Sequence, residues 1–254
     1  MNVLYGLYQA DKGEIYLNGE KKTIASPTDA IANGIGMVHQ HFMLVPSFTV
    51  AQNIVLSREP KKHGLLYDLD AANEAVARLS EEYGLHVNPR DVIGELSVGI
   101  QQRVEILKTL YRGADVLILD EPTAVLTPQE IDELMEIMRG FAAEGKSILF
   151  ITHKLNEIMA VADRCTVLRK GKYIGTVDIK DTNKQELSNM MVGRPVQLQV
   201  QKDDSNPADV ILSVRNLTVP SKTSKKDAVK DVSFDVRAGE IVCIAGIDGN
   251  GQSE

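Results

Sequence analysis

The sequence predicts an α/β fold in which a parallel sheet is covered by helices on both faces. Short runs rich in β-branched residues alternate with longer amphipathic segments along most of the 254 residues. Runs such as Val116–Leu119 and Ile148–Ile151 are apolar throughout, as strands buried on both faces of a parallel sheet require. These runs end far short of the roughly 18 apolar residues that a membrane-spanning helix needs, so we expect no transmembrane segment.

The first forty residues predict a strand, a short helix and a second strand. Gly13–Leu17 is the first strand. A helix begins at Ser26–Pro27, because serine caps helix starts and proline suits the first turn, and it ends at Asn33–Gly34. Ile35–His39 is then the second strand.

The middle of the chain, from Thr49 to about Arg112, is expected to be wholly helical. Its clearest part is an amphipathic segment from Asp70 to Tyr83, which ends at Gly84 because glycine is the usual residue after a helix. This segment predicts a helical subdomain inserted between strands.

Strand character returns at Val116–Leu119, and the following helix begins at Thr127. A capping box of Thr127 with Glu130, and Pro128 in the first helical position, predict a helix to about Glu144. Next, Ser147–Ile151 is expected to be a buried strand. The remaining elements are a helix over Leu155–Ala162, a hairpin of Arg164–Arg169 and Lys172–Val177 turning at Lys170–Gly171, and a last helix that Thr182 caps and that ends near Gly193.

A domain boundary is expected at residues 195–208, which are polar and follow no sustained period, as in a linker. Residues 1–194 then form a first domain. Residues 209–254 begin a second unit, with strands expected at Val210–Val219, Val229–Val236 and Ile241–Ala245. The second unit is β-rich and stops shortly after its third strand.

Composition excludes several classes of protein. Apolar residues make up 43% and charged residues 25%, which is typical of soluble globular proteins rather than disordered or fibrous ones. The net charge of −7 argues against nucleic acid as a partner. Cys165 and Cys243 belong to no Cys/His cluster, so we expect two buried thiols and neither disulfides nor zinc. The first residues lack a basic start and a small-residue cleavage site, which predicts a cytoplasmic protein.

The strongest chemical signal is VLILDEPTAV, where an apolar strand delivers Asp120 and Glu121 to its carboxyl end. Active sites of parallel α/β sheets lie at that edge. One carboxylate there is suited to hold Mg²⁺, and its neighbour to orient the water that attacks a phosphoryl group. A bare Asp-Glu pair is more often a surface pair at a strand end, but the following Pro122 and Thr123 argue against that interpretation here.

A second signal is ELSVGIQQRVE, which places Ser97 and Gly99 at the start of an amphipathic helix. The unpaired amides and the dipole at a helix N-terminus favour a phosphate without any lysine. Taken alone, Ser97 would be a simple helix cap. Together with LILDEPT, this segment resembles the nucleotide-binding subunits of ATP-binding cassette (ABC) importers, whose signature sequence is LSGGQ.

The resemblance implies a P-loop NTPase cassette with a parallel core sheet and a helical signature subdomain, and it assigns site residues. Asp120 is the Walker B carboxylate, which binds Mg²⁺ with Gln40 of VHQHFML, and Gln40 also senses the membrane partner. Glu121 is the general base, and His153 of FITHKL contacts the terminal phosphate of ATP.

The resemblance also assigns the signature residues and identifies departures from the family pattern. Ser97 and Gly99 touch the terminal phosphate of ATP held by the opposite half of the protein. Val98 and Ile100 replace the usual Gly and Gln, and Thr127 stands where many members carry the Asp of the D-loop. Such variants resemble the subfamily that imports simple sugars or nucleosides, and the string over residues 96–130 is especially similar to importers of the purine-nucleoside type.

A glycine-rich loop near residue 250 resembles a phosphate-binding loop without its lysine. GIDGNGQS keeps the spacing GxxxxG[K]S and thus a backbone cradle, but Gln252 replaces the lysine. The nucleotide-binding residues implied here are Gly246, Gly249, Gly251, Gln252 and Ser253. In the family, the helix resembling MNVLYGLYQ follows a complete P-loop, so the chain is expected to be truncated at both ends and the fragment a very poor ATPase.

The resemblance implies ATP and Mg²⁺ as cofactors, with transmembrane permease subunits as direct partners and an extracytoplasmic solute-binding protein as an indirect one. The protein would lie at the cytoplasmic, inner face of the plasma membrane. One alternative is a soluble tandem cassette protein acting on ribosomes or DNA, which would need a long charged helical linker in place of the short 195–208 segment. Another is a non-catalytic regulatory or interaction fragment, which the missing P-loop favours and the surviving catalytic residues oppose.

Overall fold

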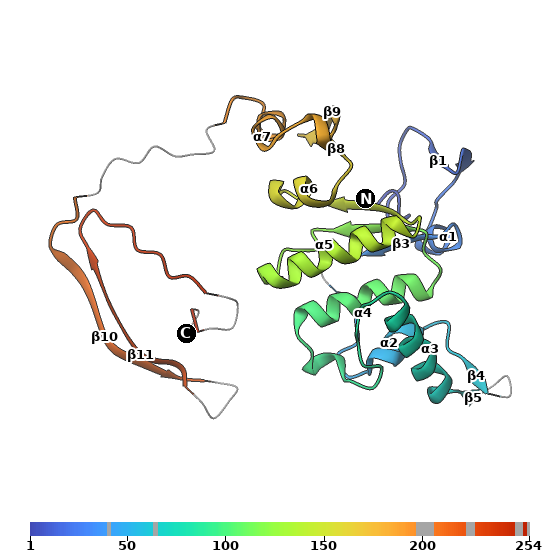
Figure 1. Cartoon of the computed structure of the whole chain (residues 1–254), viewed down its shortest axis with the longest axis horizontal. Coiled ribbons are helices and arrows are strands. Elements are labelled where there is room, and N and C mark those ends of the chain that lie inside the picture. Colours follow the sequence, from blue (N-terminus) through green and yellow to red (C-terminus); the bar gives the residue numbers. More distant parts are fainter. Residues whose placement is uncertain (40–41, 63–65, 197–205, 222–226, 247–250, 253–254) are drawn as a thin grey trace. The chain divides into compact units, whose positions relative to one another are not determined.

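The computed structural model describes residues 1–39, 42–62, 66–196, 206–221, 227–246 and 251–252 (Figure 1). The chain divides into two compact units, Met1–Val196 and Gln197–Glu254. Among the described residues, no helix combines the length and the apolar character needed to cross a membrane.

The first unit is built on a parallel sheet of β3 (Ile35–Val38), β6 (Val116–Asp120) and β7 (Ser147–Ile151), in the order β3-β6-β7. Ile35 lies opposite Val116, and Val116 lies opposite Ser147, so the three strands start level with one another. The predicted parallel sheet is confirmed, and β6, which carries Asp120, is its central strand.

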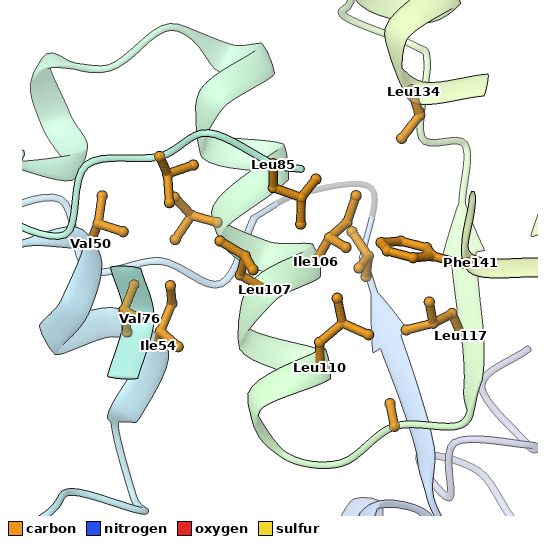
Figure 2. Packing of buried hydrophobic residues seen from close by; sticks show 14 of the residues in the cluster. Val50, Ile54, Val76, Leu85, Ile106, Leu107, Leu110, Leu117, Leu134 and Phe141 are labelled. Carbon is orange, nitrogen blue, oxygen red and sulfur yellow. The ribbon is translucent and has the colours of Figure 1, made fainter. Parts of the chain in front are cut away.

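Helices cover both faces of this sheet, as the sequence predicts. Leu117 and Leu119 of β6 pack into the larger core, whereas Ile118 packs on the opposite face with Ile24 and Ala30. Figure 2 shows the larger core, where Ile106 and Leu107 lie among side chains from other elements. The helices around it are α2 (Val50–Val55), α3 (Leu69–Glu82), α4 (Val98–Tyr111) and α5 (Pro128–Ala143), and α1 (Pro27–Ala32) covers the other face.

Side-chain hydrogen bonds cap the starts of most described helices, and in one helix the capping residue differs from the predicted one. The Thr127 side chain accepts a hydrogen bond from the Glu130 amide, and Glu130 bonds back to Thr127, which forms the predicted capping box of α5. Thr182 was expected to cap α7 (Lys184–Val192), but this is wrong. Asn183 is the cap, because its Oδ1 reaches the Glu186 amide at 3.0 Å, while the Thr182 hydroxyl donates to the Glu186 carboxylate.

The middle segment is not wholly helical, which corrects the prediction. A short hairpin of β4 (Lys61–Lys62) and β5 (Leu66–Tyr67) interrupts it, and η1 (Ile93–Glu95) precedes α4. The interruption begins at Pro60. Its carbonyl accepts a hydrogen bond from the Asp68 amide, which joins the two ends of the hairpin. A second small hairpin, β1 (Ile15–Leu17) with β2 (Glu20–Lys22), lies near the N-terminus.

The end of the first unit forms a small separate core. Here α6 (Leu155–Val161) is followed by β8 (Arg164–Arg169) and β9 (Lys172–Asp178), then by η2 (Ile179–Asp181) and α7. The hairpin turns at Lys170 and Gly171, which both have positive φ, so the predicted turn is confirmed. In Figure 1 the hairpin lies beside α7, and Ile158, Val167 and Leu187 pack together there.

One strand is less buried than predicted, and one predicted strand does not form. In β7, Leu149 is 38% exposed, because β7 pairs with β6 alone within the described residues and lies at an edge of the sheet. In the second unit, the two expected strands are present as β10 (Val210–Pro220) and β11 (Asp227–Arg237), and they pair antiparallel. Ile241–Ala245 forms no strand and Ile241 is 89% exposed, since no described strand pairs with this segment.

The two cysteines differ in environment, which corrects one more expectation. Cys165 is half-buried in β8, and burial raises the pKa of its thiol. Cys243 is exposed in the segment that forms no strand, so it is not the buried thiol that the sequence predicts.

Candidate functional site

The carboxyl ends of β6 and β7 lie side by side and carry the main candidate residues. Asp120 ends β6 opposite Ile151, the last residue of β7. The Glu121 amide donates to the Ile151 carbonyl at 3.0 Å, which extends the ladder one residue past Asp120. Because both strands run in the same direction, Glu121 and His153 leave the sheet at the same edge, where α/β proteins bind their ligands.

Glu121 and His153 are in direct contact. His153 Nδ1 lies 3.0 Å from Glu121 Oε1. The Glu121 side chain is 24% exposed and the His153 side chain 69%, so the pair faces solvent. An ionised carboxylate only accepts hydrogen bonds, so in this contact Nδ1 carries the proton and Nε2 is left for another partner.

Glu121 has a left-handed backbone, with φ of +49°. This conformation is uncommon for a residue with a side chain and costs free energy, so it persists where the surrounding structure fixes it. The Ala124 amide donates to the Glu121 carbonyl, and together with the bond to Ile151 this holds the turn on both sides. The turn aims the carboxylate at His153 instead of continuing the strand.

Asp120 is the residue best placed for a magnesium ion in the first unit. Its carboxylate is partly exposed at the strand end, one residue before Glu121. Mg²⁺ takes one or two carboxylates and completes its shell with water and substrate phosphates, so this donor set fits the ion. Within the described ranges, no group of three or more His, Cys, Asp or Glu side chains is placed to hold a metal by itself. Gln40, the other expected ligand, lies outside the described residues.

The signature residues lie at the start of α4. Ser97 is its cap and accepts from the Ile100 amide at 3.4 Å. The Glu130 carboxylate packs directly on Gly99, since a Cβ added there would lie 2.6 Å from Glu130 Cδ. In the described part of the chain, no hydrogen bond or ion pair joins Ser97 or Gly99 to Asp120, Glu121 or His153. Within the described residues, the signature therefore has no direct polar link to the three residues at the strand ends.

The structure adds polar residues behind the site that the sequence analysis missed. Gln102 is buried in α4, and its Nε2 donates to the Pro122 carbonyl at 2.7 Å, which ties α4 to the loop after Glu121. Lys154 reaches from the loop after β7 to Thr123 in the loop after β6. The sequence gives one local signal for this group, the i,i+3 spacing of Lys154 and Glu157.

The glycine-rich loop of the second unit is described in part. Gly251 has a φ of +93°, and a Cβ there would lie 2.6 Å from the Ala228 carbonyl oxygen, so the backbone packs closely on the start of β11. The Gln252 side chain packs on Gly246, with its Cδ 2.8 Å from where a Cβ would lie. Gly249 and Ser253 lie outside the described residues, so the degenerate phosphate site stays a prediction.

Comparison with known proteins gives consistent matches. The family model described as ABC transporter matches residues 1–124. The nucleoside import ATP-binding protein NupA of Lactococcus lactis is 56% identical over the whole chain, and the guanosine import ATP-binding protein NupO of Bacillus subtilis is 57% identical. The matches cover 50% and 49% of these relatives, so the chain spans about half their length.

Solved structures give the same fold. The crystal structure of the ADP conformation of MJ1267, an ATP-binding cassette of an ABC transporter, superposes with a TM-score of 0.64 at 22% identity. The match covers 76% of this chain and 82% of that one. A nucleotide-free ATP-binding cassette matches with a TM-score of 0.63 at 22% identity, over 76% of this chain and 78% of that chain.

Proposed function

The chain belongs to the ABC transporter family of ATP-binding cassettes, and we propose that it binds and hydrolyses ATP to drive import of a nucleoside or simple sugar. The observation that carries the proposal is the contact of Glu121 with His153 at 3.0 Å, at the carboxyl ends of two parallel strands. The neighbouring Asp120 supplies the carboxylate that suits Mg²⁺.

The roles of these side chains follow from their chemistry. Mg²⁺, when bound, neutralises phosphate charge. Asp120 would hold it together with water and phosphate oxygens. The Glu121 carboxylate is a proton acceptor suited to orient the attacking water. Its contact with His153 Nδ1 leaves Nε2 for a phosphate oxygen.

Signature and glycine-rich residues complete the proposal. Ser97 and Gly99 offer a helix N-terminus to the phosphates of a nucleotide held by the other half of the assembly. In the second unit, Gly251 and Gln252 belong to a loop whose amides would contact phosphate without a lysine charge.

The solute class and the partners rest on the relatives. NupA and NupO, each at least 56% identical to the chain, are named as import ATP-binding proteins for nucleosides and guanosine. A putative ribose/galactose/methyl galactoside import protein of Agrobacterium fabrum is 43% identical. We therefore place the protein at the cytoplasmic face of the membrane on permease subunits, with an extracytoplasmic solute-binding protein as an indirect partner.

A chimera tests the proposal. Residues 1–254 replace the matching half of the guanosine import protein of Bacillus subtilis, and guanosine uptake and ATP hydrolysis are measured in a strain lacking that protein. We expect uptake to be retained and both activities to be lost with Glu121→Gln, because the amide cannot accept the proton of the attacking water. Glu144→Gln, at an exposed position after α5, is the control and should leave both activities intact. Full activity in Glu121→Gln would remove this residue from the reaction.

A further inference from the structure

A polar cluster of Thr123, Thr152, Lys154 and Glu157 joins the loops that follow β6 and β7 to α6. Lys154 Nζ donates to the Thr123 carbonyl at 2.8 Å and to the Thr123 hydroxyl at 3.2 Å. It also lies 3.4 Å from Glu157 Oε1. On the other side of Glu157, the Thr152 hydroxyl donates to Oε2 at 2.8 Å. One ammonium group thus connects the loops that follow two neighbouring strands.

Burial makes this cluster hard to rearrange. Thr123 is 1% exposed and Glu157 is 4% exposed. A buried carboxylate is costly unless a cation and hydrogen-bond donors satisfy it. Lys154 supplies the cation beside Oε1, which accepts no hydrogen bond among the described residues, and Thr152 donates to Oε2, so loss of Lys154 leaves the buried Glu157 charge without its ion-pair partner. The side chain of Lys154 is therefore held in place, although it begins in a loop.

The cluster lies close in sequence to the two residues of the proposed site. Thr152 and Lys154 flank His153, and Thr123 follows Glu121 by two positions. The left-handed Glu121 is held by the Ile151 carbonyl on one side and by the Ala124 amide on the other. Lys154 adds a third restraint, because it binds Thr123 inside the turn that the Ala124 amide closes. Loss of that hold would let the Glu121 turn relax, because its conformation is not intrinsically favoured.

We propose that Lys154 is a positioning residue that holds the Glu121 carboxylate against His153, with Glu157 and Thr152 fixing Lys154 in turn. The role in catalysis rests on the proposed function, whereas the geometry it controls is measurable without any turnover. In the part of the chain that the structure describes, no hydrogen bond or ion pair joins the Lys154 ammonium to Glu121 or His153, so it acts through Thr123.

The same pair of strands offers a matched control. Lys146 lies just before β7, and its Nζ donates to the Ala114 carbonyl at 3.2 Å, just before β6. It also lies 3.8 Å from Asp115. Lys146 thus joins the amino ends of β6 and β7 as Lys154 joins the carboxyl ends. Replacing Lys146 removes a comparable strand link far from the Glu121 turn.

The experiment follows the His153 ring by ¹⁵N NMR on the full chain, with the signal assigned through His153→Gln. In the native protein the neutral ring should be mainly the Nδ1–H tautomer, because Glu121 accepts that proton. In Lys154→Met we expect this preference to be lost. In Lys146→Met we expect it to be retained, even where thermal unfolding shows that both variants lose stability.

An unchanged His153 tautomer in Lys154→Met, or an equal change in both lysine variants, would overturn the proposal, since Lys154 would then have a purely structural role. Should Lys154→Met not fold, Lys154→Gln decides, because its polar but shorter side chain does not span the distance to the Thr123 carbonyl. The chimera could be inactive while the His153 tautomer changes in Lys154→Met and not in Lys146→Met. That result would contradict the proposed function and still support the positioning role of Lys154.

Discussion

The contact between the Glu130 carboxylate and Gly99 predicts an unusual response to adding one methyl group. Gly99 lies in the first turn of α4, where Gly→Ala alone stabilises a helix by up to about 1 kcal/mol. Here the new Cβ would overlap the Glu130 carboxylate and displace it. That displacement breaks two bonds to Glu130 Oε2, from the Thr127 amide at 2.9 Å and the Thr127 hydroxyl at 3.0 Å.

The magnitude follows from these competing terms. Two lost hydrogen bonds cost about 1–3 kcal/mol, which exceeds the gain in helix propensity. Gly99→Ala should therefore destabilise the first unit by about 0.5–2 kcal/mol in the native background. In Glu130→Ala the obstacle is gone, and the same change should stabilise by about 0.5–1 kcal/mol. The coupling energy between the two positions is then about 1–3 kcal/mol.

The assay is urea unfolding followed by circular dichroism at the helix band. All described helices belong to Met1–Val196, so this signal follows the first unit. Gly140→Ala is the matched control, because Gly140 lies inside α5 with nothing within 4 Å of an added Cβ. It should stabilise by about 1 kcal/mol in both backgrounds. Equal effects of Gly99→Ala with and without Glu130 would refute the reasoning.

Two further predictions concern a backbone conformation and the thiols. The free energy of unfolding of Glu121→Gly, measured with urea, should exceed that of Glu121→Ala by about 1 kcal/mol, because glycine adopts the left-handed φ without strain. Equal free energies of unfolding would contradict this account of the turn. Iodoacetamide at neutral pH should modify the exposed Cys243 well before Cys165, whose pKa burial raises, as single-cysteine variants analysed by mass spectrometry would show. Raising the pH should speed the reaction of Cys165, because it increases the thiolate fraction. If Cys165 reacted faster than Cys243 at neutral pH, the burial of Cys165 would not be maintained in solution.

Sequence reasoning worked where short-range chemistry decides the structure. The capping box at Thr127 and the turn at Lys170–Gly171 depend on residues within a few positions of one another, and both are confirmed. The parallel sheet was also predictable, because Val116–Leu119 is apolar on both faces.

The errors lie where partners distant in sequence, or competing local ones, decide. Whether Ile241–Ala245 forms a strand depends on a neighbouring strand, which its own apolar pattern does not reveal. Thr182 and Asn183 are both good caps, and only the backbone geometry selects the second. Lys154 meets Thr123 across 31 residues, so no local pattern indicates that contact.

The order of strands in the sheet has a consequence for how the first unit folds. Pairing β6 with β7 closes a loop of roughly 30 residues, whereas pairing it with β3 closes roughly 80, and the longer closure costs about 0.9 kcal/mol more entropy. The compact piece β6–α5–β7 is therefore expected to assemble first. Asp120, Glu121 and His153 all lie on that piece or in the loops that leave it. The proposed catalytic edge would then be among the earliest parts of the chain to take shape, before β3 and the residues that precede it join the sheet.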